Sequence, residues 1–189
     1  MLMTIAIVVA VVVLAVLILA ATKPDTFRIQ RQTSIKATPD RVFALIDDFH
    51  AHLLWSPFEK DPAMKRNLSG APRGKGAVYE WNGNNKVGAG RIEITDTSPP
   101  ARGTAGTVVM ALDMLKPFKA HNEVEFVIEP KGDATIVTWA MQGAQPFIGK
   151  VMGTFINCDK MVGKDFEAGL AKLKSLAEKP SNEGARHAA

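Results

Sequence analysis

The chain has 189 residues, of which 47% are hydrophobic and 22% are charged, and its formal net charge is +4 at pH 7. Ala, Val, Ile, Leu and Met account for 20 of the first 21 residues, whereas hydrophobic residues make up about 40% of the remainder, an ordinary share for a soluble domain. This distribution excludes fibrous, disordered and multi-span proteins, and the mild, dispersed basic charge argues against nucleic-acid binding.

The N-terminal segment is long enough to span a bilayer, because a helix over residues 1–21 measures about 31 Å and the hydrocarbon core is roughly 30 Å thick. We expect a transmembrane anchor over residues 1–22. A cleaved secretory signal is the alternative, but no Lys or Arg precedes Lys23. Basic residues after the segment predict a single-pass membrane protein whose domain faces the cytoplasm and contacts anionic headgroups. They are Lys23, Arg28, Arg31 and Lys36.

The globular part begins with a strand and a short helix. Residues 27–35 alternate between apolar and polar side chains, which predicts a half-buried strand. The period changes at Thr38, which can cap a helix with Pro39 in its first turn, and this helix is expected to end near Asp47-Asp48. Residues 49–58 are consistent with a second short helix or a structured loop.

Strand patterning dominates the middle of the chain. Residues 64–76 contain Gly, Pro, Ser and Asn without periodicity and are predicted to form a loop. Turn residues separate the segments that follow, so we predict an antiparallel meander of about five strands after the first one. These segments are 77–82, 88–96, 107–115, 120–129 and 134–142.

Helical periodicity returns from Ile148 to Ala177, where apolar residues recur at spacings of three, four or seven and predict one long amphipathic helix. Cys158 falls among these apolar residues and is expected to be a buried, unreactive thiol. Residues 180–189 have almost nothing to bury and are expected to form a flexible tail.

The predicted fold class is α+β with a helix-grip architecture. A curved antiparallel sheet of about six strands surrounds the long C-terminal helix in one domain over residues 23–179, preceded by one N-terminal transmembrane helix. One helix cannot fill the concave face of such a sheet, so an internal cavity is expected.

Four stretches carry a family resemblance: Trp55-Ser56-Pro57-Phe58, residues 79–84 with 87–91, the 115–118 step, and residues 159–167. Together they resemble the polyketide cyclase/dehydrase-type branch of the START-like superfamily, also called SRPBCC. The resemblance implies a deep hydrophobic pocket, which members use for lipid carriage, hormone sensing, aromatic-ring cyclisation or ring hydroxylation. Rieske-type Cys and His ligands are missing from the sequence, so we exclude the hydroxylase role.

Bulky, adaptable side chains on the elements that such a fold directs inward are the candidate pocket lining. They are Trp55, Trp81, Met110, Met114, Trp139, Met141, Phe147, Met152 and Phe155. The alternative is that many of them merely fill the core. As a set they favour an apolar or aromatic ligand, so we predict a membrane-anchored domain that binds a hydrophobic small molecule or lipid as a carrier or sensor.

An enzyme is the alternative function, namely a cofactor-free cyclase or dehydratase with a buried acid/base residue. A carboxylate that points from a strand into an apolar cavity would have a raised pKa and could shuttle protons. The candidates are three carboxylates on predicted strands and one histidine: Glu80, Glu93, Asp113 and His50.

We expect neither a metal ion nor a cofactor. His50 and His52 are two residues apart, whereas metal ligands on one helix face lie three or four apart. Gly83, Gly88 and Gly90 flank two strands and therefore do not form a dinucleotide-binding fingerprint.

Overall fold

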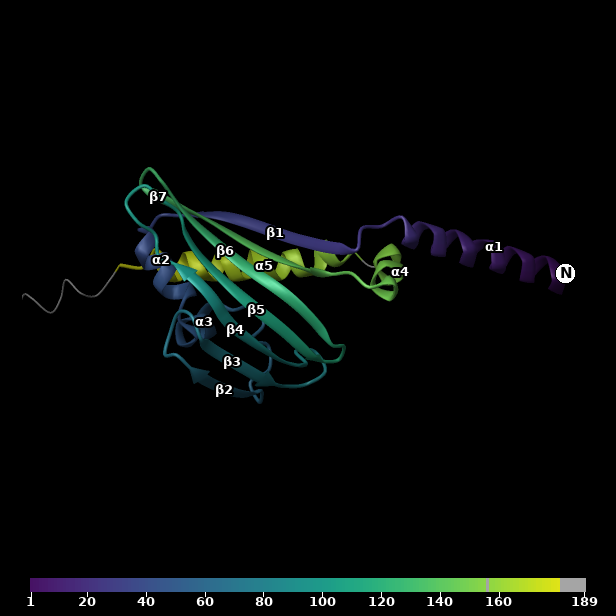
Figure 1. Cartoon of the computed structure of the whole chain (residues 1–189), viewed down its shortest axis with the longest axis horizontal. Helices are drawn as coiled ribbons and strands as arrows, with labels where there is room; N and C mark the ends of the chain where they lie inside the picture. Colours follow the sequence, from purple (N-terminus) through teal and green to yellow (C-terminus); the bar gives the residue numbers. More distant parts are fainter. Residues whose placement is uncertain (156, 181–189) are drawn as a thin grey trace, which may run out of the picture.

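The structure, a computed structural model, describes residues 1–155 and 157–180. Its seven strands form one antiparallel sheet in the order β1-β7-β6-β5-β4-β3-β2, which curves around the C-terminal helix (Figure 1). In chain order the elements are α1 (Leu2–Ala21), β1 (Thr26–Ile35), α2 (Pro39–Ile46), α3 (Phe49–Trp55), β2 (Lys65–Gly70), β3 (Ala77–Asn82), β4 (Ala89–Ser98), β5 (Gly106–Lys116), β6 (Ala120–Lys131), β7 (Ala134–Ala144), α4 (Phe147–Phe155) and α5 (Cys158–Ala177).

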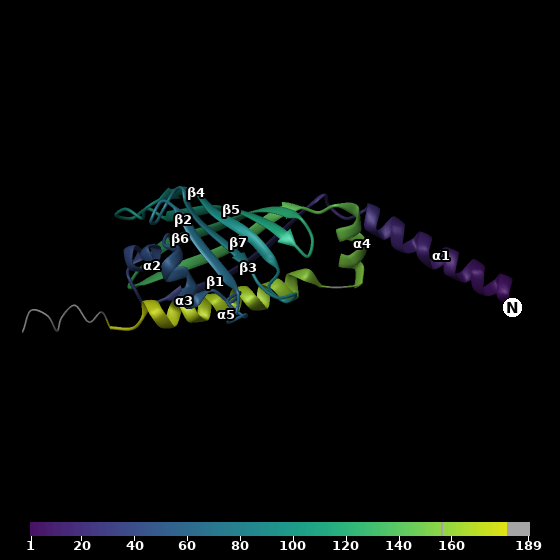
Figure 2. The same cartoon turned by 90° about the horizontal axis from the view of Figure 1, so that it is seen from below.

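This architecture confirms the predicted α+β fold class, with one strand more than expected. α5 runs along one face of the sheet, and α2 and α3 cover that face at the end far from α1 (Figure 2). The expected tail over residues 180–189 lies outside the described residues, except for Pro180.

Helix α1 projects away from the sheet along the long axis of the molecule (Figure 1). Within the described residues it is the one helix that is long and apolar enough to cross a bilayer, a test that a signal sequence also passes. Its side chains are exposed, and only Ala20 is buried.

The first strand and both short helices form where the local sequence favours them. β1 buries Ile29 and Ile35 and exposes alternate residues, as the pattern predicts. Thr38 has the extended backbone of an N-cap, but its side chain makes no capping hydrogen bond, and Pro39 occupies the first helical turn of α2. Residues 49–55 form a helix, α3, which Asp48 caps by accepting a hydrogen bond of 2.7 Å from the His50 N–H.

The loop predicted over residues 64–76 is wrong in part, because residues 65–70 form β2. This strand pairs only with β3 and lies at the edge of the sheet. Nearly every residue of β2 is exposed. An edge strand that buries so little carries no apolar alternation, so the sequence pattern could not reveal it.

The prediction of a single long C-terminal helix is also wrong, because the region forms two helices, α4 and α5, instead of one. Asn157 has a non-helical backbone and caps α5, since its side chain accepts a hydrogen bond of 2.8 Å from the Lys160 N–H. Apolar residues on either side of the break, Phe155 and Val162, are seven positions apart, so the helical period continues across it. Cys158 consequently lies in the first turn of α5 and is exposed, which overturns the prediction of a buried thiol.

The hydrophobic core lies between the sheet and the helices α2, α3 and α5, and it includes a cluster of aromatic rings. Trp139 of β7 stacks on Phe166 of α5, with ring centroids 4.0 Å apart and planes at 7°. Trp55 packs edge-on against Trp139 at 5.7 Å, and Phe126 stacks on the same ring at 5.0 Å. The residues that α5 buries begin at Gly163, so the first turn of α5 is left out of this core.

Candidate functional site

A cavity of about 660 Å³ lies at the end of the sheet close to α1, between β1, β7, α4 and the first turns of α5. This volume falls in the range of about 300–1,000 Å³ that is typical of small-molecule sites. Its apolar wall consists of Phe27, Ile29, Met141, Ala144, Pro146, Phe155 and Val162. Both views show α4 between this end of the sheet and α1 (Figures 1 and 2), so the cavity lies on the side of the domain that carries the apolar helix.

Two glycines of α4 help to create the space. Gly149 and Gly153 are four residues apart, so they share one face of the helix, and both line the cavity. A methyl group at Gly149 would lie 3.7 Å from Cγ of Gln145, which is ordinary van der Waals contact. Packing therefore does not require a glycine at position 149, and the missing side chain adds to the cavity volume.

Three polar side chains that line the cavity, those of Arg28, Asp159 and Asn157, already have protein partners. Nη1 of Arg28 donates a hydrogen bond of 2.9 Å to Oε1 of Gln142. Asp159 accepts a hydrogen bond of 3.0 Å from Arg31, which lowers the pKa of the Asp159 carboxyl. The Asn157 side chain caps α5. With these groups occupied, the lining offers a ligand mainly apolar surface.

An ion pair between a buried lysine and an exposed carboxylate ties α4 to the connection that follows α1. The Nζ of Lys150 donates a hydrogen bond of 2.6 Å to Oδ1 of Asp25, and this bond together with the positive charge lowers the pKa of Asp25. The Lys150 side chain is 9% exposed, whereas that of Asp25 is 95% exposed. Lys23 adds two hydrogen bonds through its Nζ, one of 3.1 Å to Oγ1 of Thr154 and one of 3.3 Å to the carbonyl oxygen of Lys150.

Sequence reasoning missed this link. Lys150 is the one charged residue in the apolar stretch over residues 146–155. A lone lysine among apolar residues is nevertheless a signal, because a buried ammonium group requires a partner.

The predicted pocket residues divide into three groups. Met141 and Phe155 line the cavity. Three others are buried in the core instead, and these are Trp55, Met110 and Trp139. The remaining four are half-buried or exposed away from the cavity lining, and these are Trp81, Met114, Phe147 and Met152.

The three candidate carboxylates lie on the outer face of the sheet. Their sequence neighbours Tyr79, Ile92, Ile94 and Leu112 belong to the core or pack against it, so alternation turns the carboxylates the other way. Each one bonds a polar side chain on that outer face: Glu80 accepts from Asn67 at 2.8 Å, Glu93 pairs with Arg91 at 2.6 Å, and Asp113 pairs with His121 at 2.7 Å. The inward orientation that the acid/base hypothesis requires is therefore wrong for all three.

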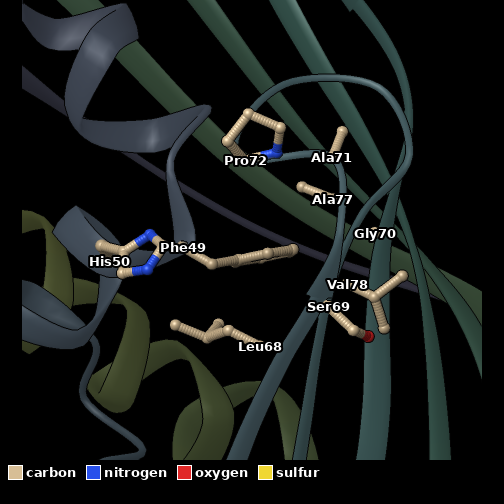
Figure 3. Close-up of a pocket in the computed structure, with 9 residues that line it drawn as sticks. All are labelled: Phe49, His50, Leu68, Ser69, Gly70, Ala71, Pro72, Ala77 and Val78. Carbon is tan, nitrogen blue, oxygen red and sulfur yellow. The ribbon is translucent and has the colours of Figure 1, made fainter.

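The fourth candidate, His50, lies at a much smaller cavity of about 130 Å³ between α3 and the β2–β3 edge (Figure 3). Phe49, Leu68 and Val78 also line this space. The His50 side chain is 67% exposed, and its Nδ1 lies 3.1 Å from Oδ1 of Asp48. The cavity is smaller than a typical small-molecule site, so it offers room for a small group only.

His52, two residues further along α3, has the opposite environment. Its ring packs edge-on against Trp55 at a centroid distance of 4.5 Å, and its Nδ1 is buried without a hydrogen-bond partner. Burial lowers the pKa of His52 to about 4, so the ring is neutral at pH 7. Among the residues that the structure describes, no three His, Cys, Asp or Glu side chains are grouped so that they could hold a metal ion.

A curved antiparallel sheet around a C-terminal helix, with a cavity between them, defines the START-like class of domains. The chain belongs to the family described as polyketide cyclase/dehydrase and lipid transport, whose model matches residues 26–178. This match and the fold confirm the resemblance that the sequence motifs indicate.

Solved structures show the same fold at low sequence identity. A protein from Chromobacterium violaceum is 14% identical, with a TM-score of 0.57 over 84% of this chain and 100% of its own. Major latex-like protein 151 from Panax ginseng is 14% identical, with a TM-score of 0.57 over 82% and 100%. A Helicobacter pylori protein reaches a TM-score of 0.60 at 7% identity, over 83% and 90%. A search of curated proteins finds no match.

Proposed function

We propose that this protein is a membrane-anchored START-like domain that binds a hydrophobic small molecule or lipid in the cavity between the sheet, α4 and α5. The observation that carries the proposal is the cavity of about 660 Å³, which has a largely apolar wall and lies at the end of the domain where α1 joins. A carrier or sensor of amphiphiles requires this combination, because its ligand must leave the bilayer and enter an apolar site.

The composition of the lining supports binding by burial of apolar surface. Transfer of apolar surface out of water contributes about 25 cal/mol per Å², so a ligand gains most of its affinity from side chains such as Met141, Phe155 and Val162. Arg28 and Asp159, which also line the cavity, are held by protein partners and are therefore less available to a charged ligand.

We infer that α1 is retained as an anchor. It is long and apolar enough to cross a bilayer, and four basic residues follow it within residues 23–36. On this reading the domain faces the cytoplasm. Mass spectrometry of the membrane fraction tests retention, since a retained anchor leaves the mass of the full chain unchanged.

The cyclase or dehydratase alternative has less support. It requires an acid or base inside the cavity, and the candidate carboxylates lie on the other face of the sheet. Asp159 does line the cavity, but Arg31 lowers its pKa, which is opposite to the raised value that a general acid needs at neutral pH.

Photo-crosslinking with a diazirine-bearing fatty acid tests the proposal on the full chain in nanodiscs. We expect adducts on Met141, Phe155 or Val162 in addition to those on α1. Gly149→Leu fills the cavity and should abolish the first set, whereas Ala171→Leu on the exposed side of α5 should keep it. Adducts confined to α1 in the unmodified chain would contradict ligand binding in the cavity.

The choice of Gly149 also controls for helix stability. Leucine has a higher helix propensity than glycine by nearly 1 kcal/mol, so Gly149→Leu is not expected to unfold α4. The nearest atoms to a new Cβ at this position are 3.7 Å away. Loss of adducts would therefore report a filled cavity rather than a damaged helix.

A further inference from the structure

Helix α4 has three different faces. Gly149 and Gly153 line the cavity, and Lys150 and Thr154 bind the connection after α1. The third face carries two large apolar side chains four positions apart, and both are exposed in the part of the chain that the structure describes. They are Ile148 and Met152, which are 66% and 46% exposed.

A second exposed apolar group lies at the turn between β5 and β6. Leu115 is 54% exposed and Phe118 is 74% exposed. Lys116 and Lys119 are their immediate neighbours in sequence and are exposed as well. Figures 1 and 2 both place this turn at the end of the sheet that faces α4 and α1.

The link to α1 limits how far α4 can lie from a bilayer. Only residues 22–24 lie between Ala21, the last residue of α1, and Asp25, the residue that Lys150 binds. In extended backbone, the four steps from Ala21 to Asp25 span at most about 14 Å. The headgroup layer on each side of the hydrocarbon core is several Å thick, so an α1 that crosses the bilayer holds α4 beside or within this layer.

We propose that the α4 face and the β5–β6 turn together form a second membrane contact, which lies on an anionic phospholipid surface. The inference rests on the anchor of the proposed function. Apolar side chains of an interfacial helix enter the headgroup and acyl boundary by about 5–10 Å, and lysines beside them attract anionic lipids. The glycine face of α4 then holds the cavity at the membrane surface, so an amphiphile enters it without crossing water.

Site-directed spin labelling of the full chain tests this contact in nanodiscs of phosphatidylcholine and phosphatidylglycerol. The native cysteine is first removed by Cys158→Ser. Spin labels are then attached to single cysteines introduced at the proposed contact by Ile148→Cys and Phe118→Cys. Val11→Cys in α1 is the lipid control, and Ala171→Cys on the exposed side of α5 is the water control. Collision with oxygen, compared with a water-soluble nickel chelate, reports whether each label lies in lipid.

We expect the oxygen-to-nickel ratio at positions 148 and 118 to be several-fold higher than at position 171. Aqueous labels at 148 and 118, with position 11 in lipid, would overturn the second contact and leave the anchor in place. An aqueous label at position 11 would overturn both. Aqueous accessibility with dipolar broadening at position 148 would mean that a second copy covers this face, which would also overturn the membrane contact.

Discussion

Lys150 and Asp25 form an ion pair at 2.6 Å in which the lysine is buried and the carboxylate is almost fully exposed. The pair joins α4, which forms one wall of the cavity, to the four-residue connection after α1. The Gln145 N–H strengthens the same junction through a hydrogen bond of 2.7 Å to the Asp25 carbonyl oxygen. The cavity and α1 are therefore mechanically linked by two residues that are 125 positions apart in sequence.

The two sides of this ion pair should respond differently to mutation. Asp25→Asn leaves a buried ammonium group without its carboxylate, whereas Lys150→Met leaves a carboxylate that water already solvates. We expect Asp25→Asn to lower the hydrogen-exchange protection of residues 147–155 more than Lys150→Met does. Mass spectrometry of the full chain in nanodiscs measures this, with the exposed Asp40→Asn as control. Equal protection in all three variants would show that the ion pair does not hold α4.

Stability should depend on pH through His52. Its folded pKa is about 4 and its ordinary value is 6.5, so between these values the unfolded chain binds more protons than the folded chain. The free energy of unfolding therefore decreases as the pH falls from 6.5 to 4, and His52 accounts for about 3 kcal/mol of this decrease.

Urea unfolding in detergent micelles, followed by tryptophan fluorescence at pH 7.5 and 5, measures the His52 contribution. His52→Leu should flatten the pH dependence relative to the unmodified chain. His50→Leu is the matched control on the same helix, because the His50 ring is exposed. An unchanged pH dependence in His52→Leu would contradict the assignment of this effect to His52.

Two glycines in neighbouring helices should respond in opposite directions to alanine. A Cβ at Gly169 would lie 2.8 Å from Cζ3 of Trp139 and 2.9 Å from Cδ of Pro57, both parts of rigid rings. We expect Gly169→Ala to lower the free energy of unfolding by about 1–3 kcal/mol through overpacking. Gly149→Ala meets its nearest atoms at 3.7 Å, an ordinary van der Waals distance, and should raise the free energy of unfolding by up to about 1 kcal/mol through helix propensity. Thermal or urea unfolding compares the two, and the same sign for both would refute the packing argument.

Cys158 should react readily with thiol reagents in the folded protein, because it is exposed in the first turn of α5. We expect a maleimide to modify one thiol per chain at nearly the rate seen after denaturation. Cys158 also lines the cavity, so saturating oleate should slow the reaction. A thiol that reacts only after unfolding would contradict the break between α4 and α5.

Local physical chemistry was enough to predict several elements. Twenty apolar residues in the first 21 specify a helix that can cross a bilayer, and alternation over residues 27–35 and 120–129 specifies strands with one buried face. These features depend on periods of 3.6 and 2 residues, which the sequence displays directly. The order of strands and helices was also sufficient for the α+β helix-grip class.

The remainder depended on which elements meet in space. The α4–α5 break leaves the apolar period intact, and β2 takes its place by hydrogen bonding to β3 rather than by burying a face. The sequence could not decide whether the side chains of Glu80, Glu93 and Asp113 point inward. Alternation shows that a strand has two faces, but it does not show which face packs against α5.

The sequence by itself therefore determined an apolar N-terminal helix, a strand-rich domain and its family, because these follow from local pattern and motif. Only the tertiary structure decided where the cavity lies. Trp139 and Phe166 stack and close one end of the sheet, while Lys150 reaches Asp25 and keeps α4 and its glycines at the other end. Contacts between residues so far apart in sequence form by packing and charge pairing as the chain folds. The hydrophobic periodicity of a short segment does not reveal them.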